Sequence, residues 1–198
     1  MRTDKKQLKQ QAIEQAAYDL IEEKGFLGMS MLAIAKRARA SNETLYNWYG
    51  DKNGLFKTLI ENNAAETKAL LENAASNPRN PLSTLEKLGP TLLDLLLGER
   101  AIALNRAAAA DPTGELGKLL SAAGKETVFP LIVDLFSQLE PVGPQKALKA
   151  AQDYLGLLVG DMQIRRAIGA INKPIKSEMQ TRSENALAAL RLIYQIGE

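Results

Sequence analysis

The 198-residue sequence contains neither cysteine nor histidine. The lack of cysteine excludes disulfides and thiolate nucleophiles, and the lack of histidine excludes Ser-His-Asp triads and almost every zinc or haem site. Aromatic residues are also scarce, at 5% of the chain. We therefore expect no metal or other cofactor, and the range of enzymatic chemistry open to the chain is narrow.

Long apolar runs are absent as well. No stretch approaches the roughly 18 apolar residues that a membrane-spanning helix needs, and the charged N-terminus, MRTDKKQLKQQAIEQ, has no apolar segment of signal-peptide length. These absences predict a cytoplasmic protein with no membrane partner. The net charge is only +2, but residues 1–60 hold ten Lys and Arg against seven Asp and Glu. The small basic excess therefore lies in the N-terminal part of the chain.

The sequence is rich in leucine and alanine, and these residues recur at helical spacing. Hydrophobic residues make up 45% of the chain, and no run alternates polar and apolar residues at period two. This pattern predicts an all-α fold. Turn-forming residues at 76–81, 111–114, 141–144 and 172–174 interrupt the helical pattern after about residue 52. The expected helices there span residues 52–75, 82–98, 99–110, 113–139, 144–170 and 176–196.

Residues 30–56, SMLAIAKRARASNETLYNWYGDKNGLF, have the spacing of two short helices joined by a tight turn. A longer helix over about residues 6–24 precedes them and ends at Gly25, a typical C-cap residue. Ser30 and Ser41 are good N-cap residues, because a serine hydroxyl can accept a hydrogen bond from the first free backbone amides. The short helices are therefore expected at about residues 31–38 and 42–49.

The second short helix has two distinct faces. Leu45, Trp48 and Tyr49 share one face at i, i+3, i+4 spacing. A helix can read the major groove only if its buried face locks it to a scaffold and its exposed face carries short hydrogen-bonding side chains. Both conditions are met, so a DNA-reading element is predicted. The polar residues that point away from the apolar face are Asn42, Glu43, Thr44 and Asn47.

Residues 33–56, AIAKRARASNETLYNWYGDKNGLF, resemble the DNA-binding signature of the TetR family of transcriptional regulators. The resemblance covers about the first quarter of the chain. It implies an all-helical homodimer with a helix-turn-helix domain at residues 1–52 and a larger domain at 53–198 that binds a ligand and forms the dimer. The matching positions are Ile34, Ala35, Ala38, Ser41, Thr44, Leu45, Tyr46, Tyr49, Asp51, Lys52 and Leu55.

The resemblance also implies which side chains meet double-stranded DNA. Ser41, Thr44, Tyr46 and Lys52 would contact phosphates. Three residues would lie nearest the bases, and three more complete the predicted interface. The base-facing residues are Asn42, Glu43 and Asn47, and the additional ones are Ser30, Arg39 and Trp48.

Several of these positions have a second interpretation. Arg39 stands where the family usually has glycine, so either the turn differs or Arg39 adds a phosphate contact. Glu43 would be repelled by phosphates unless it accepts from a cytosine amino group or pairs with Arg39. The rings of Trp48 and Tyr49 are expected mainly in the core. Tyr46 can pack its ring and still reach a phosphate with its hydroxyl.

The dimer is predicted to form through the last two helices, which gives a palindromic operator. One apolar stripe holds Leu187, Leu190, Ile193 and Tyr194. The other holds Tyr154, Leu155, Leu158, Val159 and Met162 beside Gly156 and Gly160, although this glycine pair is also consistent with a crossing within one chain.

The effector is expected to be small and hydrophobic. Only Phe129, Phe136, Tyr154 and Tyr194 supply aromatic rings after residue 56, so a pocket there would be mostly aliphatic. This composition favours an acyl or other aliphatic ligand over a flat cation, which aromatic faces would grip. The predicted ligand-binding residues are Arg106, Phe129, Tyr154 and Gln163.

The resemblance implies a repressor by default, which an effector releases from its operator. Two alternatives stay open at this point. The first is an activator, or a regulator of the same fold that acts through protein contacts. The second, much weaker alternative is a helical enzyme that uses Asp134, Asp153 or Asp161, since carboxylates are available on the C-terminal helices.

Overall fold

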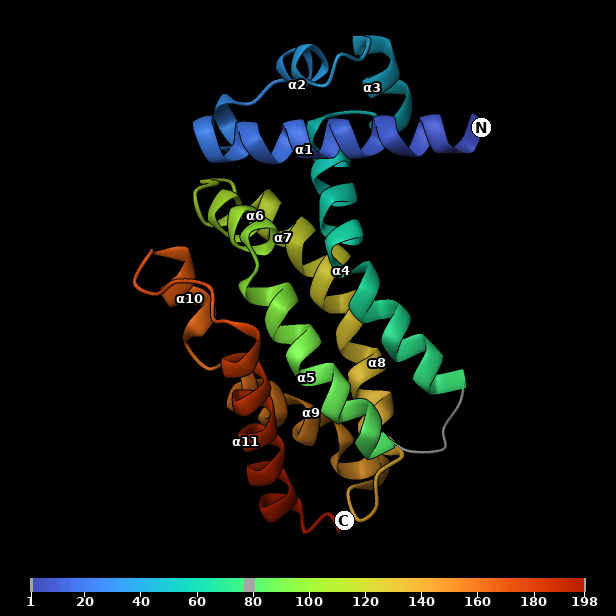
Figure 1. Ribbon diagram of the computed structural model, residues 1–198, viewed down its shortest axis with the longest axis vertical. Helices are drawn as coiled ribbons and strands as arrows, with labels where there is room; N and C mark the ends of the chain where they lie inside the picture. Colours follow the sequence, from blue (N-terminus) through green and yellow to red (C-terminus); the bar gives the residue numbers. More distant parts are fainter. Residues whose placement is uncertain (1, 77–80, 198) are drawn as a thin grey trace. The chain divides into compact units, whose positions relative to one another are not determined.

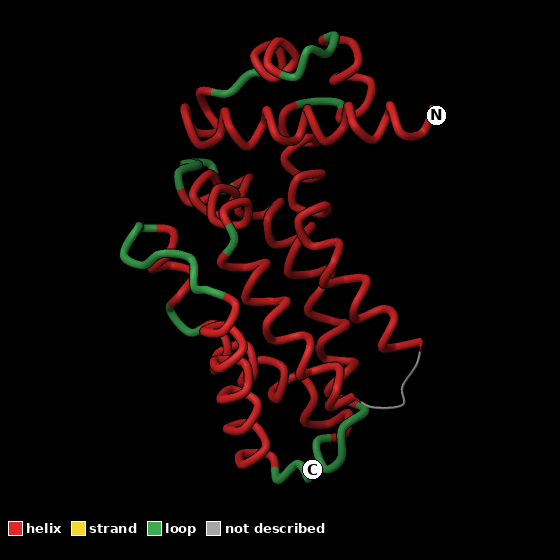
Figure 2. The backbone as a smooth tube through the Cα atoms, viewed as in Figure 1, coloured by secondary structure: helices red, strands yellow, loops and turns green. Residues whose placement is uncertain are grey.

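The computed structural model describes residues 2–76 and 81–197, with side chains described for 5–73 and 81–197. Within these ranges every regular element is helical, which confirms the predicted all-α fold (Figures 1 and 2). The helices are α1 (Arg2–Gly28), α2 (Met31–Arg37), α3 (Asn42–Tyr49), α4 (Lys52–Ser76), α5 (Pro81–Leu97), α6 (Glu99–Ala109), α7 (Glu115–Leu120), η1 (Ser121–Lys125), α8 (Glu126–Ser137), α9 (Gly143–Val159), α10 (Met162–Ala167) and α11 (Lys176–Tyr194).

The chain divides into two compact units. The N-terminal unit comprises residues 1–62 and 103–123, and the C-terminal unit comprises residues 63–102 and 124–198. The helices α4 and α6 therefore contribute residues to both units. The functional boundary between residues 52 and 53 stays a prediction, because these units follow backbone contacts and not activity.

The start of the N-terminal unit follows the predicted caps. Gly25 adopts a φ of 69° and a ψ of 168°, which interrupts α1 where a C-cap was expected. Ser30 Oγ accepts a hydrogen bond from Ala33 N at 3.2 Å, and Ser41 Oγ accepts one from Thr44 N at 3.0 Å. Both serines therefore cap the short helices as predicted. The core beneath them includes Ile13, Ala17, Ile34, Leu45, Leu55, Phe56 and Leu59.

The junction between α3 and α4 is unusually close. Asp51 Oδ1 accepts a hydrogen bond from Gly54 N at 2.7 Å, so Asp51 caps α4. A Cβ atom at Gly54 would lie only 1.9 Å from the carbonyl oxygen of Tyr49. Glycine is therefore needed at position 54 for the end of α3 to reach the first turn of α4.

In the C-terminal unit, α8 packs on α9, and α11 packs on both α5 and α9. The core between them is mainly aliphatic, with the rings of Phe136 and Tyr154 tilted against each other at a centroid distance of 5.6 Å. None of the described helices has both the length and the apolar stretch required to cross a bilayer.

The segment predicted as one helix over 113–139 is helical without a break from Glu115 to Ser137, with the π-helical turn η1 between α7 and α8. Another predicted helix was wrong in its continuity. The segment predicted over 144–170 ends at Val159, because Gly160 leaves the helix with a φ of 52°. A Cβ at Gly160 would also lie 3.0 Å from the guanidinium of Arg182. Backbone conformation and a distant arginine both favour glycine there, and neither leaves a trace in local periodicity.

The predicted dimer stripes were also wrong in part. Tyr154, Leu158, Leu187 and Leu190 are all buried in the core of the C-terminal unit. The most continuous apolar stripe of a helix packs within its own chain first, since this removes the largest apolar area from water. A Cβ at Gly156 would meet no atom within 4 Å, so this glycine does not serve a crossing within the chain.

The close junction predicts opposite effects for two glycine substitutions. Gly54→Ala should lower the free energy of unfolding by at least about 2 kcal/mol, because the added methyl group overlaps a backbone carbonyl. The matched control is Gly117→Ala in α7, where a Cβ meets nothing within 4 Å. That control should raise stability by about 0.5–1 kcal/mol, as alanine does in an open helix. Urea unfolding of both variants tests the prediction, and equal effects would contradict it.

Candidate nucleic-acid interface

The helix α3 presents a polar face to solvent. Asn42, Glu43, Tyr46 and Asn47 are exposed, while Leu45 is fully buried in the core of the N-terminal unit. Asparagine amides can pair with an adenine edge, and a carboxylate can accept from a cytosine amino group. The structure therefore places all three predicted base-facing residues on one accessible surface.

Ser41 and Thr44 form a hydroxyl pair at the start of this face. Their oxygens lie 2.7 Å apart, in addition to the capping bond from Thr44 N to Ser41 Oγ. A hydrogen bond between two hydroxyls uses one of their two protons, so the pair keeps a second proton to donate. The N-terminus of α3 also favours an anion through its unpaired amides. Ser30, at the start of α2, has the same capping geometry.

Arg39 occupies the turn between α2 and α3 in a left-handed conformation. Its φ is 49°, and Ala40 N donates to Ala35 O at 2.9 Å across it. This bond pattern closes a helix with a residue that is usually glycine, because a side chain there crowds the backbone. The turn therefore keeps the geometry expected for glycine and carries an exposed guanidinium. No ion pair between Arg39 and Glu43 occurs among the described residues.

Lys52 is held within its own unit. Its Nζ donates to the carbonyl oxygens of Phe26 and Met29 at 3.0 and 3.2 Å and lies 4.5 Å from the centre of the Phe26 ring. Two of its three donor protons are therefore directed at the end of α1 and at the loop that follows it. These bonds hold Lys52 against that segment, and the predicted phosphate contact would use the third proton.

The rings at the end of α3 lie at the edge of the core. Tyr49 is buried, and Trp48 is half-buried and packs edge-on against it at a centroid distance of 6.4 Å. Lys6 of α1 lies 5.8 Å from the centre of the Trp48 ring. Tyr46 is 49% exposed. The expectation that Tyr49 is a core residue is confirmed.

The hydroxyl of Tyr49 is buried without a hydrogen-bond partner among the described residues. Burial raises the pKa of Tyr49 to about 12, and the nearby carboxylate of Glu14 acts in the same direction. Both effects disfavour the tyrosinate.

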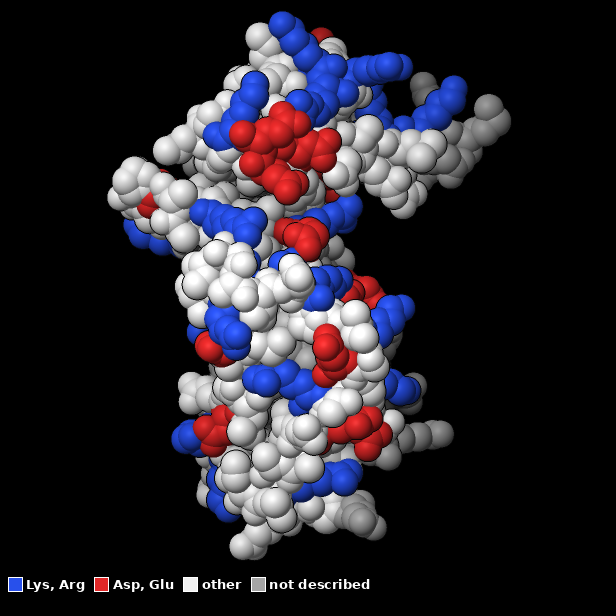
Figure 3. Space-filling model, turned by 60° about the vertical axis from the view of Figure 1, so that its left-hand side comes forward, with Lys and Arg blue, Asp and Glu red and all other residues white. Residues whose placement is uncertain are grey.

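The two arginines near the end of α2 differ in their surroundings. Arg37 forms a two-point ion pair with Glu23, with N–O distances of 2.7 and 2.8 Å. The side-chain hydrogen bond from Arg37 holds the pKa of Glu23 below its ordinary value. Figure 3 shows basic side chains gathered over part of the N-terminal unit, with acidic ones grouped on the same face. Arg37 is thus partly neutralised, unlike Arg39.

The predicted ligand-binding residues are not brought together into one described pocket. Arg106 is an exposed residue of α6 in the N-terminal unit, whereas the other three lie in the C-terminal unit. Phe129 is half-buried, with Lys125 Nζ 6.0 Å from the centre of its ring. Tyr154 is fully buried and donates to Leu85 O at 3.3 Å, and Gln163 Nε2 donates to Leu96 O at 3.2 Å.

One buried group was missed. Thr67 on α4 is 1% exposed, and its hydroxyl has no hydrogen-bond partner among the described residues. Thr67 stands between Glu66 and Lys68 in the sequence, and nothing in that pattern marks a buried hydroxyl.

A capped turn between two short helices, the second with a polar exposed face and a buried apolar face, defines a helix-turn-helix DNA-binding module. The chain belongs to the TetR family. The profile of bacterial regulatory proteins of the tetR family matches residues 13–59. A second profile, the C-terminal domain of AefR-like transcriptional repressors, matches residues 83–196.

Known proteins are similar to this chain in fold or in a short segment. A crystal structure described as a TetR-family regulator from Mesorhizobium loti has 24% identity and a TM-score of 0.75, over 94% of this chain and 96% of that one. A TetR regulator from Agrobacterium tumefaciens has 25% identity and a TM-score of 0.70, over 94% of each chain. The uncharacterised HTH-type regulator YdeS of Bacillus subtilis is 49% identical over 41 residues, which span 21% of either chain. That match therefore covers about a fifth of the length of YdeS.

The left-handed turn predicts a gain in stability on mutation. Arg39→Gly should raise the free energy of unfolding by about 0.5–1 kcal/mol. Relief of the left-handed conformation is worth about 1–2 kcal/mol, and the greater freedom of glycine in the unfolded chain offsets part of it. Arg39→Ala is the control, because alanine keeps the crowded Cβ. Chemical unfolding measures the free energy of unfolding of both variants. If the glycine variant is no more stable than the alanine variant, the prediction of backbone strain at Arg39 is wrong.

The buried hydroxyl predicts a stability difference that appears only at alkaline pH. At neutral pH, Tyr49→Phe should be neutral or slightly stabilising, since it removes an unsatisfied polar group. Above pH 10 the unfolded tyrosine ionises while the folded one stays protonated up to about pH 12. The wild type should therefore lose stability relative to the variant as the pH rises, by about 1 kcal/mol at pH 11. Urea unfolding at pH 7, 9 and 11 measures this, and a constant difference would refute it.

Proposed function

We propose that this chain is a repressor that binds a palindromic operator as a homodimer and is released by a small hydrophobic effector. The observation that carries the proposal is the face of α3. Its amide and carboxylate groups are exposed together, while Leu45 and Tyr49 lock the opposite face into the core. Such a helix can enter the major groove without losing its own support.

The phosphate contacts are proposed at both ends of this face. The hydroxyl pair of Ser41 and Thr44 can donate to a phosphate near the start of α3. Arg39 adds a charge from the preceding turn, and Tyr46 adds a hydroxyl from the exposed side. These contacts would fix the register of α3, and Asn42, Glu43 and Asn47 would supply sequence preference.

The dimer is proposed to use the outward faces of α9 and α11. Leu148, Leu157 and Leu192 are exposed there, and Gly156 and Ala188 leave room for a close approach. An isologous pairing through this surface would present two copies of α3 to one DNA duplex. Half-sites about 34–36 Å apart, or a multiple of this, would then form a palindrome.

The effector is proposed to be aliphatic because the interior of the C-terminal unit is built mainly from leucine, isoleucine, valine and alanine. Tyr154 and Gln163 are already hydrogen-bonded to carbonyl groups of α5, so ligand contact there would require this packing to open. Thr67 offers a buried hydroxyl that a polar group of the effector could satisfy. Phe129 and Arg106 stay proposed contacts.

Selection of bound sequences from a random DNA pool, at stated salt, tests whether the protein recognises a specific DNA sequence. Recovery of a palindrome supports the dimeric reader, and recovery of no preferred sequence would favour a regulator that acts through protein contacts. Adding fatty acids and acyl thioesters of increasing length to the selected complex then tests release. A complex unaffected by every member of the series would overturn the aliphatic effector.

Two arginine variants test the phosphate contacts on the selected site. Arg39→Gln should lower the slope of log affinity against log salt by about one unit per half-site, since one phosphate contact is lost. Arg37→Gln is the matched control, because Arg37 is already paired with Glu23. Its slope should change much less. If the salt-dependence slope falls equally in the two variants, Arg39 does not make the proposed phosphate contact.

A further inference from the structure

Residues 171–174 of the loop between α10 and α11 help to line a hollow in the C-terminal unit. Its volume is about 520 Å³, within the range of about 300–1,000 Å³ that is usual for small-molecule sites. The other lining residues come from α5, from α10 with the residue before it, and from α11. All of them belong to the C-terminal unit, so one unit alone forms the hollow.

One part of this hollow is apolar. Leu93 is fully buried and Met179 is 4% exposed, while Met162 and Pro174 are partly buried. Methionine side chains are flexible and adapt to the shape of an apolar partner. These four residues can therefore cover a short hydrocarbon group, and we call them the apolar lining.

Three cationic side chains line the same hollow, and two of them have an acidic partner. Lys173 Nζ lies 2.6 Å from a carboxylate oxygen of Asp94, and Arg165 Nη1 lies 3.9 Å from one of Asp161. The third cation is Arg182. Within the part of the chain that the structure describes, no carboxylate lies at ion-pair distance from its guanidinium. Arg182 is therefore the cation of this hollow that lacks a full counter-charge.

The guanidinium of Arg182 also keeps donors free. Its Nε donates to Leu158 O and its Nη2 donates to Leu157 O at 3.3 Å, and both acceptors are neutral carbonyl groups at the end of α9. Its Nη1 makes no hydrogen bond to the described residues. A guanidinium carries five N–H donors, and its planar edge matches the two oxygens of a carboxylate. Arg182 can therefore bind a carboxylate without giving up its bonds to α9.

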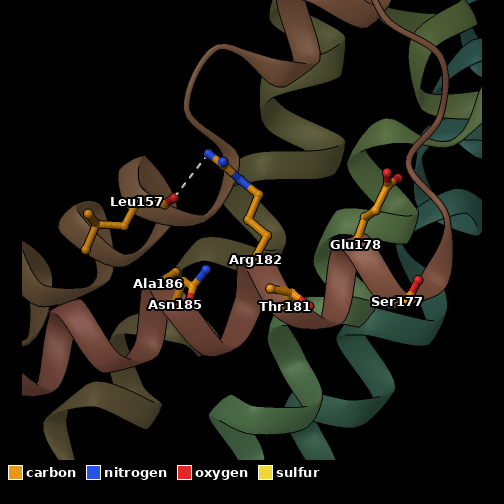
Figure 4. Close-up of a pocket in the computed structure, with 7 residues that line it drawn as sticks. All are labelled: Leu157, Ser177, Glu178, Thr181, Arg182, Asn185 and Ala186. Carbon is orange, nitrogen blue, oxygen red and sulfur yellow. Dashed lines mark hydrogen bonds between the residues drawn. The ribbon is translucent and has the colours of Figure 1, made fainter.

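Glu178 stands one turn before Arg182 on α11, but its carboxylate is engaged at the start of the helix. Glu178 Oε2 accepts a hydrogen bond from Ile175 N at 2.9 Å. Figure 4 shows the guanidinium of Arg182 extending toward Leu157 and the carboxylate of Glu178 extending away from it. The acid at i, i+4 spacing, which could pair with Arg182 on an isolated helix, therefore leaves it without a counter-ion here.

We propose that this hollow binds a small organic carboxylate, with Arg182 as its counter-ion and the apolar lining around its hydrocarbon group. An inorganic anion would leave the apolar lining in contact with water, and a neutral apolar molecule would leave the free donors of Arg182 unused. The two features together therefore favour a ligand that carries both a carboxylate and a hydrocarbon group.

The site is distinct from its surroundings in its lining. A neighbouring hollow of about 530 Å³ shares Glu178 and Arg182, but its other side chains are mainly polar, among them Ser177, Thr181 and Asn185. The aliphatic interior proposed for the effector has no such cations among its core residues. The carboxylate site is therefore an addition to the proposed function and does not depend on it.

Isothermal titration of the full chain, without DNA, tests the site with hexanoate as the probe. Hexan-1-ol supplies the same hydrocarbon chain without charge, and inorganic phosphate supplies charge without hydrocarbon. Hexanoate should bind saturably, and the other two compounds should bind about tenfold more weakly or not at all. Arg182→Gln should weaken hexanoate binding about 10- to 100-fold, because charge-assisted hydrogen bonds to the carboxylate are lost.

Lys176→Gln is the matched control. Lys176 is an exposed cation at the start of the same helix, and it does not line the hollow. Its removal changes the charge of the chain as Arg182→Gln does, so it should alter hexanoate affinity by less than about twofold. A loss as large as that of Arg182→Gln would mean general attraction by charge and would overturn the site.

Asn172→Asp is a second test that keeps the packing of Arg182. Asn172 is exposed and lines the hollow, so this nearly isosteric change places a negative charge there. It should weaken hexanoate binding about three- to tenfold and leave hexan-1-ol unaffected. Circular dichroism verifies that each variant is folded, and Asn172→Asp decides the matter should Arg182→Gln fail to fold.

The remaining outcomes are also decisive. Absence of saturable hexanoate binding would overturn the site. Binding that neither Arg182→Gln nor Asn172→Asp weakens would also overturn it, since hexanoate would then occupy another part of the chain, such as the aliphatic interior. Phosphate or hexan-1-ol that binds as tightly as hexanoate would overturn the organic carboxylate. None of these results involves DNA, so the proposed repressor is tested separately.

Discussion

The exposed face of α3, which we propose reads DNA, depends on the close junction between α3 and α4. Gly54 lies against the carbonyl of Tyr49, and Asp51 caps the first turn of α4. Lys52 then ties that turn to the carbonyl group of Phe26 near the end of α1 and to that of Met29 in the loop before α2. With the Ser41 cap at its other end, α3 is fixed at both termini. Base recognition requires this, because hydrogen bonds to base edges tolerate little displacement.

In the C-terminal unit, arginines perform the equivalent task at the ends of helices. The last carbonyl groups of a helix lack partners within it, and a cation there also complements the helix dipole. Arg182 of α11 donates to the carbonyl oxygens of Leu157 and Leu158 at the end of α9. Arg166 does the same for Leu97 at the end of α5. Each arginine therefore satisfies orphan acceptors and joins two helices that are distant in sequence.

Local signals in the sequence predicted the helices, the two serine caps and the exposed face of α3, since each depends on residues within one or two turns of one another. The features that the sequence did not predict depend on residues that are not neighbours in the sequence. The break at Gly160 depends on backbone conformation and on Arg182, and the close contact of Gly54 depends on how α3 meets α4. The predicted dimer stripes were wrong in part for a related reason. Periodicity shows that a helix has an apolar face, but it does not show whether that face packs within the chain or on another one.

The helices that belong to both units set a condition on regulation. Glu99, the first residue of α6, is paired with Arg166 of α10 within the C-terminal unit, and the residues of α6 from 103 onward belong to the N-terminal unit. An effector bound by the C-terminal unit would change the DNA affinity of the proposed repressor only to the extent that it bound two arrangements of the chain unequally.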